Sequence, residues 1–185
     1  SNEYKELSIK VSVCGLAGVG KSCTLLHLTG ARTDLLNVKH VETSGIQILS
    51  VKWPIKVKNG PIHLFNINLW DIAHKNSQYY MQQDSKNGSH VRLYFISATD
   101  HKSYLYVYQQ LEKDRDFPMI SLVIITKTDN NEKYQLSEDD LKSLNKEFNC
   151  QILRISNFPI SNLPFYSQRS VCNILNTITT SVLRK

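Results

Sequence analysis

The sequence has few cysteines, glycines and prolines and no long apolar run. Among 185 residues there are 4 Cys, 7 Gly and 5 Pro. The cysteines lack CxxC or Cys/His metal spacing, so a zinc module is excluded and reduced thiols in a cytosolic protein are expected. The scarcity of Gly and Pro argues against disorder except at the ends. Apolar stretches such as SLVIIT are far shorter than a membrane span.

Basic residues only moderately outnumber acidic ones, which gives a formal net charge of +6. The basic residues are scattered, and the clusters are small, as at Lys52, Lys56 and Lys58. A basic total permits contact with nucleic acid, anionic membrane or an acidic partner, but scattered charge favours a solvated surface, so no nucleic-acid partner is expected. The ends SNEYKELS and SVLRK show no signal-peptide core and no prenylation box, so we expect a cytoplasmic protein without a lipid anchor, meeting membranes only through partners.

Apolar β-branched runs alternate with helical stretches along the whole chain. This alternation predicts a single α/β domain over residues 1–185, with a six-stranded, mostly parallel sheet and helices on both faces. The dipeptide Asn59-Gly60 suits a type I′ hairpin turn, and Pro54 marks the preceding strand as an antiparallel edge strand. Ser137 is expected to cap a helix. The strands are expected at 7–15, 45–57, 61–71, 90–97, 119–126 and 150–156, and the helices at 21–30, 101–114, 137–148 and 170–183.

The segment GLAGVGKS matches the phosphate-loop pattern GxxxxGK[ST] between a predicted strand and a predicted helix. Its glycines let backbone N–H groups turn toward phosphate oxygens, and the helix N-terminus adds partial positive charge. Lys21 would reach the β- and γ-phosphates, and the Ser22 hydroxyl would bind Mg²⁺. The pattern alone does not separate GTPases, ATPases and nucleotide kinases. The expected nucleotide cradle is Gly15, Ala17, Gly18, Val19, Gly20, Lys21, Ser22 and Cys23.

Asp71 ends the strand NINLWD and fits the carboxylate that holds Mg²⁺ directly or through water. The element WDIAHK resembles the W-D-[TC]-A-G-Q element of Ras-like small GTPases, and TKTD resembles their guanine-reading N/T-K-x-D element. The segment ETSGIQ resembles the first switch of Rab-like members. That resemblance makes Thr43 the residue that closes on Mg²⁺ and the γ-phosphate, with Ser44 as its rival.

The resemblance to Ras-like small GTPases implies a P-loop GTPase fold that binds GTP or GDP with Mg²⁺. It places Asp129 on guanine N1–H and the exocyclic amine, which adenine cannot match, and Lys127 along the base plane. Thr126 takes the Asn position, as in Rho-type members. The last base-contacting element of the family is degenerate here, and Ser156 and Asn157 are its candidates.

Two segments, HVETSGIQILSVKWPIKV and ILRISNFP, are similar to the Rab-like small GTPases of the ciliogenesis and planar polarity effector group. That similarity implies an unlipidated GTPase that works with the proteins Inturned and Fuzzy. It also implies a place at the basal body of the cilium, in recruiting the intraflagellar transport machinery.

The sequence departs from the Ras-like pattern where hydrolysis is performed. His74 replaces the switch-two Gly, and Lys75 replaces the Gln that orients water. A Gln amide both accepts and donates, whereas a Lys ammonium only donates, so very slow hydrolysis is expected. Ala17 adds a methyl group where Ras-type proteins carry Gly. No Phe, Tyr or Trp lies between Cys23 and Lys52 to stack on the base.

Three other interpretations stay open at this stage. His74 could act as a general base. The chain could be a pseudo-GTPase, a binding module whose nucleotide is structural or absent. A P-loop nucleotide kinase is the third, although it needs a lid with Arg residues, and no suitable Arg cluster follows Asp71.

Overall fold

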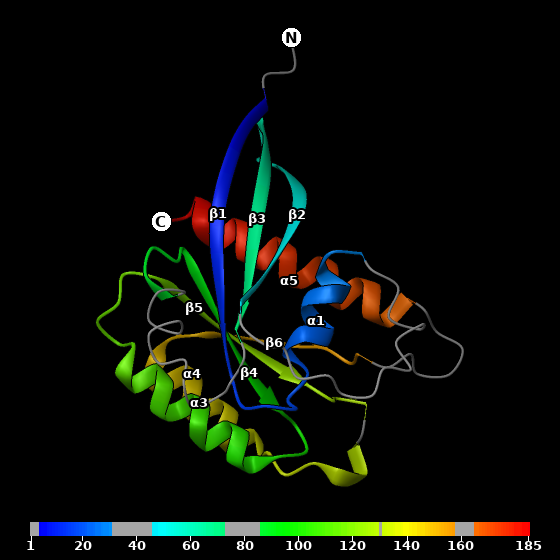
Figure 1. The fold of residues 1–185 in the computed structure, drawn as a ribbon, viewed down its shortest axis with the longest axis vertical. Helices are drawn as coiled ribbons and strands as arrows, with labels where there is room; N and C mark the ends of the chain where they lie inside the picture. The colour runs from blue at the N-terminus through cyan, green and yellow to red at the C-terminus, as the bar shows by residue number, and fades with distance from the viewer. Residues whose placement is uncertain (1–3, 31–45, 73–85, 130, 158–164) are drawn as a thin grey trace.

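A computed structural model describes residues 4–30, 46–72, 86–129, 131–157 and 165–185 (Figure 1). Its centre is a six-stranded sheet in the order β2-β3-β1-β4-β5-β6. Only β2 runs antiparallel to its neighbour, so the predicted α/β architecture with one antiparallel edge strand is confirmed. The strands are β1 (Tyr4–Cys14), β2 (Ile46–Lys56), β3 (Ile62–Ile72), β4 (Val91–Ser97), β5 (Ile120–Thr126) and β6 (Gln151–Arg154), and the helices are α1 (Lys21–Leu28), α3 (His101–Lys113), α4 (Glu138–Phe148) and α5 (Phe165–Leu183).

Helices α1 and α5 cover one face of the sheet, and α3 and α4 cover the other (Figure 1). Successive residues of a strand point to opposite faces, so a strand buried on both sides needs a continuous apolar run. Strand β4 is buried along its whole length, and Arg92, the charged residue that interrupts its apolar run, is paired with Asp114. Leu93 packs into the core beneath α1 and α5, and the next residue, Tyr94, packs into the core beneath α3 and α4.

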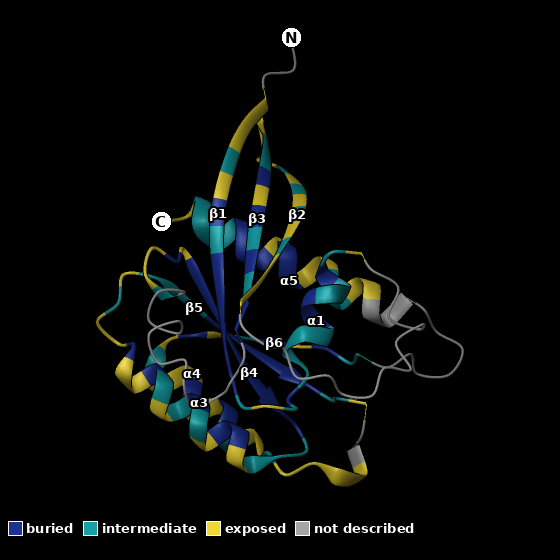
Figure 2. Ribbon diagram, in the orientation of Figure 1, coloured by how far each residue is buried: buried dark blue, intermediate teal, exposed yellow. Residues whose placement is uncertain are grey.

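Strands β1, β2 and β3 extend beyond the body of the domain, and many of their residues there are exposed (Figure 2). Strand β2 is the edge, as Pro54 predicts.

The type I′ turn predicted at Asn59-Gly60 is wrong. Lys56 pairs with Ile62, and the amide of Gly60 donates to the Val57 carbonyl at 3.0 Å. Asn59 has a positive φ of 60°, but Gly60 does not, and a type I′ turn requires both.

Helix α4 begins as its sequence predicts. The Ser137 side chain accepts from the Asp140 amide, and the Asp140 carboxylate accepts from the Ser137 amide, which completes a capping box. The observed boundaries lie within two residues of the expected ones except at the starts of β1 and α5. Strand β1 begins at Tyr4 because its first residues pair with the extended end of β3, where Tyr4 lies opposite Ile62. Helix α5 begins at Phe165, before its periodic apolar pattern starts.

A buried charged cluster joins the start of β4 to the end of α3. The Asp114 carboxylate pairs with Lys86 Nζ at 2.6 Å and with Arg92 Nε at 3.2 Å, and it accepts from Tyr94 Oη at 2.7 Å. Lys86 also lies over the Phe117 ring, 3.5 Å from its centroid. Burial, helped by Asp114, raises the pKa of Tyr94, so Tyr94 stays a neutral donor. One carboxylate is therefore the shared counter-ion of two buried cations.

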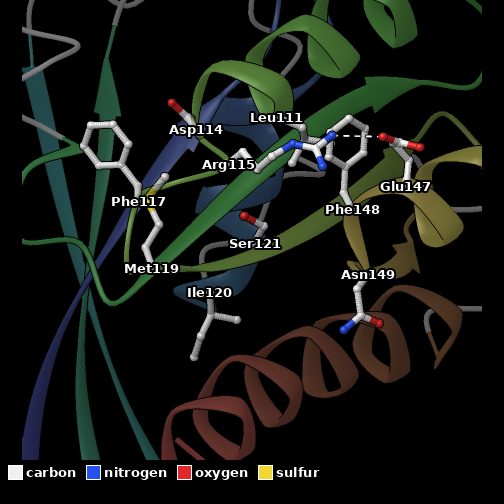
Figure 3. A pocket seen from close by; sticks show the side chains of 10 residues that line it. All are labelled: Leu111, Asp114, Arg115, Phe117, Met119, Ile120, Ser121, Glu147, Phe148 and Asn149. Atoms are coloured by element: carbon white, nitrogen blue, oxygen red, sulfur yellow. Dashed lines mark hydrogen bonds and ion pairs between the residues drawn. The ribbon is translucent and has the colours of Figure 1, made fainter.

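A cavity of about 400 Å³ lies beside this cluster, between the C-terminal ends of α3 and α4 (Figure 3). At its rim, Arg115 donates to Glu147 at 2.9 Å and lies over the Phe148 ring. The cavity lies at the start of β5, at Ile120. The phosphate-loop sequence follows the end of β1, and because β1 and β5 run in the same direction, the two lie at opposite ends of the strands. Its lining is Leu111, Asp114, Arg115, Phe117, Met119, Ile120, Ser121, Glu147, Phe148 and Asn149.

Asp114→Ala should destabilise the fold strongly, because it leaves Lys86 and Arg92 buried without their anion. We expect the free energy of unfolding, measured by urea denaturation, to fall by about 3–5 kcal/mol. Glu112→Ala is the control, because Glu112 forms only an exposed pair with Arg115 and should change stability little. Equal effects of the two substitutions would contradict the role assigned to Asp114.

Candidate functional site

The loop from Gly15 to Gly20 lies at the C-terminal end of β1, the strand flanked by β3 and β4. Parallel α/β sheets bind ligands at this edge, where the chain connections diverge. Gly15 adopts a φ of 154°, and a Cβ added there would lie 2.9 Å from the Phe95 carbonyl oxygen. Gly20 adopts a φ of 94° and precedes α1, whose first turn receives no side-chain cap. The loop therefore presents uncapped amides where an anion would bind.

Lys21 bends back over this loop. Its Nζ donates to the Gly15 carbonyl at 2.9 Å and to the Leu16 carbonyl at 2.7 Å. Burial lowers the pKa of Lys21, and the nearby carboxylate of Asp71 acts against that shift. A partly desolvated ammonium surrounded by loop backbone is suited to receive phosphate oxygens.

Ser22 and Asp71 meet at the start of α1. Ser22 Oγ donates to Asp71 Oδ2 at 2.5 Å, and Asp71 is 1% exposed. A hydroxyl and a carboxylate are hard oxygen donors, the kind that Mg²⁺ prefers. Within the described ranges no group of three or more His, Cys, Asp or Glu could hold a metal. This donor set fits Mg²⁺, which usually binds one or two carboxylates and takes its other ligands from phosphates and water.

Thr126 connects the end of β5 to the phosphate loop. Its hydroxyl donates to the Val19 carbonyl at 2.5 Å, and it is completely buried. The next residue, Lys127, has a φ of 56°, so the chain turns sharply there, and Asp129 is exposed. The Thr128 carbonyl accepts from Tyr134 Oη at 2.7 Å, which braces the turn. The TKTD segment is thus held next to the phosphate loop through its first residue.

Asn157, in the segment just after β6, lies against α1. Its Nδ2 donates to Thr24 Oγ1 at 2.8 Å and to the Gly20 carbonyl at 3.4 Å, and its Oδ1 lies 3.0 Å from His27 Nδ1. Sequence reasoning missed Thr24 and His27. Asn157 is 133 residues from Thr24, and no local signal reports such a contact. Ser156, next to Asn157, is half-buried.

For the remaining predicted site residues, the structure gives, within its described ranges, no contact that indicates a role. Ala17 is exposed, and burial raises the pKa of the half-buried Cys23. Thr43, His74 and Lys75 lie outside the described residues. Their roles stay predictions from sequence.

A family model described as "Ras of Complex, Roc, domain of DAPkinase" matches residues 10–129, or 120 of the 185 residues. The chain belongs to the Roc family of Ras-like GTPase domains. The matched range contains the phosphate loop, Asp71 and the TKTD segment. Membership in this family implies guanine-nucleotide binding.

This Roc domain is also similar to proteins named "Ciliogenesis and planar polarity effector 2". The Xenopus laevis protein is 28% identical over 152 residues, covering 79% of this chain and 59% of the relative. The Mus musculus protein is 27% identical over 157 residues, covering 82% and 60%, and the Homo sapiens protein is 25% identical over 165 residues, covering 82% and 60%. The resemblance seen in the sequence is confirmed, and the chain spans about 60% of the length of these curated relatives.

All four cysteines are free thiols. Among the helices of the described ranges, none combines the length and the apolar character needed to cross a bilayer.

Gly15→Ala should distort the phosphate loop of the Roc domain, because the new Cβ would meet a backbone oxygen at 2.9 Å. We expect a loss of about 3 kcal/mol or more in the free energy of unfolding of the nucleotide-free protein, measured in urea. Gly88→Ala is the matched control, since Gly88 has a φ of +70° but open space around it. It should lose only about 1 kcal/mol. Equal losses would contradict the packing described for Gly15.

Proposed function

We propose that this Roc domain is a GTP-binding molecular switch that uses Mg²⁺ and hydrolyses GTP very slowly. The observation that carries the proposal is the contact of Ser22 with Asp71 at 2.5 Å, beside the Lys21 ammonium and the uncapped start of α1. A cation, two oxygen donors and backbone amides are the set that nucleotide phosphates and their metal require. The chemistry that Mg²⁺ would supply there is compensation of the phosphate charge.

The residues of the cradle have distinct roles in this proposal. Ser22 and Asp71 hold the metal, and Thr43 is the expected third protein ligand. Lys21 exchanges its bonds to the Gly15 and Leu16 carbonyls for bonds to phosphate. Because burial lowers the pKa of Lys21 in the free protein, the added negative charge should raise it again and fix the ammonium form.

Selection of guanine is assigned to the turn that follows β5. Asp129 would accept from guanine N1–H and from the exocyclic amine, and Lys127 would lie along the base. The bond from Thr126 to Val19 supports this assignment because it holds the turn beside the phosphate loop. A site that hydrogen-bonds a base edge rejects a base lacking those donors by several orders of magnitude.

Slow hydrolysis is assigned to His74, Lys75 and Ala17. Lys75 can stabilise phosphate charge, but it cannot accept a hydrogen bond from the attacking water as Gln does. His74 can donate its amide only from conformations open to a residue with a Cβ. A partner protein would have to supply the missing group, and without it the switch stays loaded with GTP.

The cellular setting is proposed from the relatives. Their shared name connects them to ciliogenesis and planar polarity. We extend to this chain an effector complex of the Inturned–Fuzzy type, a cytoplasmic location and the basal body of the cilium as the place of action.

A pseudo-GTPase is the second candidate. It is favoured by one observation: Lys21 already has partners within the chain in the Gly15 and Leu16 carbonyls, and Ser22 has one in Asp71. In that case the domain would be a protein-interaction module whose fold needs no nucleotide.

Nucleotide content separates the two candidates. Protein purified with Mg²⁺ and then heat-denatured should release about one guanine nucleotide per chain, measured by ion-exchange chromatography. Lys21→Ala should release almost none, because a charge-assisted contact to phosphate is lost. Lys52→Ala, which removes an exposed lysine, should match the wild type. An empty wild-type protein whose melting temperature ignores added GTP and Mg²⁺ would support the pseudo-GTPase instead.

The double substitution His74→Gly with Lys75→Gln should raise the single-turnover rate of GTP hydrolysis. We expect an increase of roughly 100-fold or more, in line with the effect of water-positioning groups in this chemistry. The rate is measured with [γ-³²P]GTP preloaded on the protein, and exposed Lys52→Gln is the control. An unchanged rate would contradict the assignment of slow hydrolysis to these two positions.

A further inference from the structure

The side chain of Asn157 forms its hydrogen bonds with α1 and the residue that precedes it. Its amide reaches three residues of that helix and its cap: Gly20, Thr24 and His27. Asn157 itself lies just after β6, in the segment that the sequence assigns to base contact. One side chain thus spans the base side and the phosphate side of the site.

The donors and acceptors of this contact form an ordered chain. Thr24 Oγ1 has one proton, which it donates to the Gly20 carbonyl at 2.9 Å, so it can accept from Asn157 Nδ2 at 2.8 Å. Asn157 Oδ1 then accepts from the Nδ1–H of His27 at 3.0 Å. Thr24 is completely buried, so in the folded protein its hydroxyl depends on these partners for its hydrogen bonds.

Gly20 is the point where the two sides converge. A Cβ built on Gly20 would lie 3.2 Å from Asn157 Nδ2 and 3.8 Å from Thr126 Cβ. The Thr126 hydroxyl donates to the carbonyl of Val19, the residue before Gly20, and the Asn157 amide donates to the carbonyl of Gly20 itself. The end of the phosphate loop is therefore held by one residue from β5 and one from the end of β6.

We propose that Asn157 is a positioning residue that locks the segment after β6 to the first turns of α1 and so slows the release of bound guanine nucleotide. The inference rests on the proposed function. Release requires the base-binding and phosphate-binding segments to separate, and the Asn157 amide resists that separation. Since this amide is used by Gly20, Thr24 and His27, the side chain of Asn157 does not read the base.

The test is the dissociation rate of a fluorescent GDP analogue from protein loaded with it in Mg²⁺, chased with excess GDP. Asn157→Ala should accelerate release by roughly 10-fold or more, because the buried Thr24 hydroxyl and the half-buried His27 ring lose their bonds to it. Thr24→Val keeps the volume and removes the hydroxyl, so it should also accelerate release. The double variant should be no faster than the faster single variant, because both break the same contact.

Asn176→Ala is the matched control. Asn176 is an exposed asparagine on α5 that accepts from Trp53 Nε1 at 2.9 Å, away from the phosphate loop, and its loss should leave the release rate unchanged. The preference for GDP over ADP should also stay unchanged in Asn157→Ala, since the side chain is not assigned to the base. Thr24→Val gives an independent answer if Asn157→Ala does not fold.

Three results would overturn the proposal. Unchanged release in both Asn157→Ala and Thr24→Val would show that the contact does not control nucleotide exit, while the proposed function stands. A lost preference for guanine with an unchanged release rate would make Asn157 a base reader. A wild-type protein that binds no guanine nucleotide would overturn the proposed function as well.

Discussion

The hydrogen bond from the Thr126 hydroxyl to the Val19 carbonyl is the contact on which the arrangement of the site depends. It is 2.5 Å long and buried, and it joins the end of β5 to a loop that begins at the end of β1. Parallel strands bring their C-terminal ends to one edge of the sheet, but they do not fix how the following loops lie against each other. This bond does so for the phosphate loop and the TKTD segment. Both segments lie within the range that the Roc family model matches, and this bond joins them directly.

Buried or half-buried charged groups lie at both ends of the sheet's parallel strands, and the two groups differ in their partners. At the ligand edge, a desolvated Lys21 lies near a buried Asp71, and their surroundings are completed by the loop's own carbonyls and by Ser22. At the opposite end of the strands, Asp114 pairs with both Lys86 and Arg92 inside the domain. Lys21 bonds to loop carbonyls, which phosphate oxygens could replace. Lys86 and Arg92 instead bond to a carboxylate, which already balances part of their charge. We infer that the first group is built for binding and the second for holding α3 against the sheet.

Sequence predicted those parts of the fold and site that local spacing encodes. The phosphate-loop motif, the capping box at Ser137, the edge position of the Pro54 strand and the alternation of strands and helices all follow from local patterns. The turn at Asn59-Gly60 was predicted wrongly because strand pairing ends at Lys56 and Ile62, which leaves a longer loop than the two-residue turn that the dipeptide favours. The bond of Asn157 to Thr24 and the pairing of Arg92 with Asp114 join distant parts of the chain, and no local pattern announces them. The roles of Thr43, His74 and Lys75 remain predictions, since those residues lie outside the described ranges.

The central claim is that one guanine nucleotide binds this Roc domain with Mg²⁺. The most direct test is calorimetric titration of nucleotide-free protein with GDP and, separately, with ADP, in the presence and absence of Mg²⁺. The account predicts one GDP per chain, tighter binding with Mg²⁺, and no measurable heat with ADP. Equal binding of ADP would contradict the assignment of the base to the TKTD segment, and the absence of any GDP binding would contradict the account of the site as a whole.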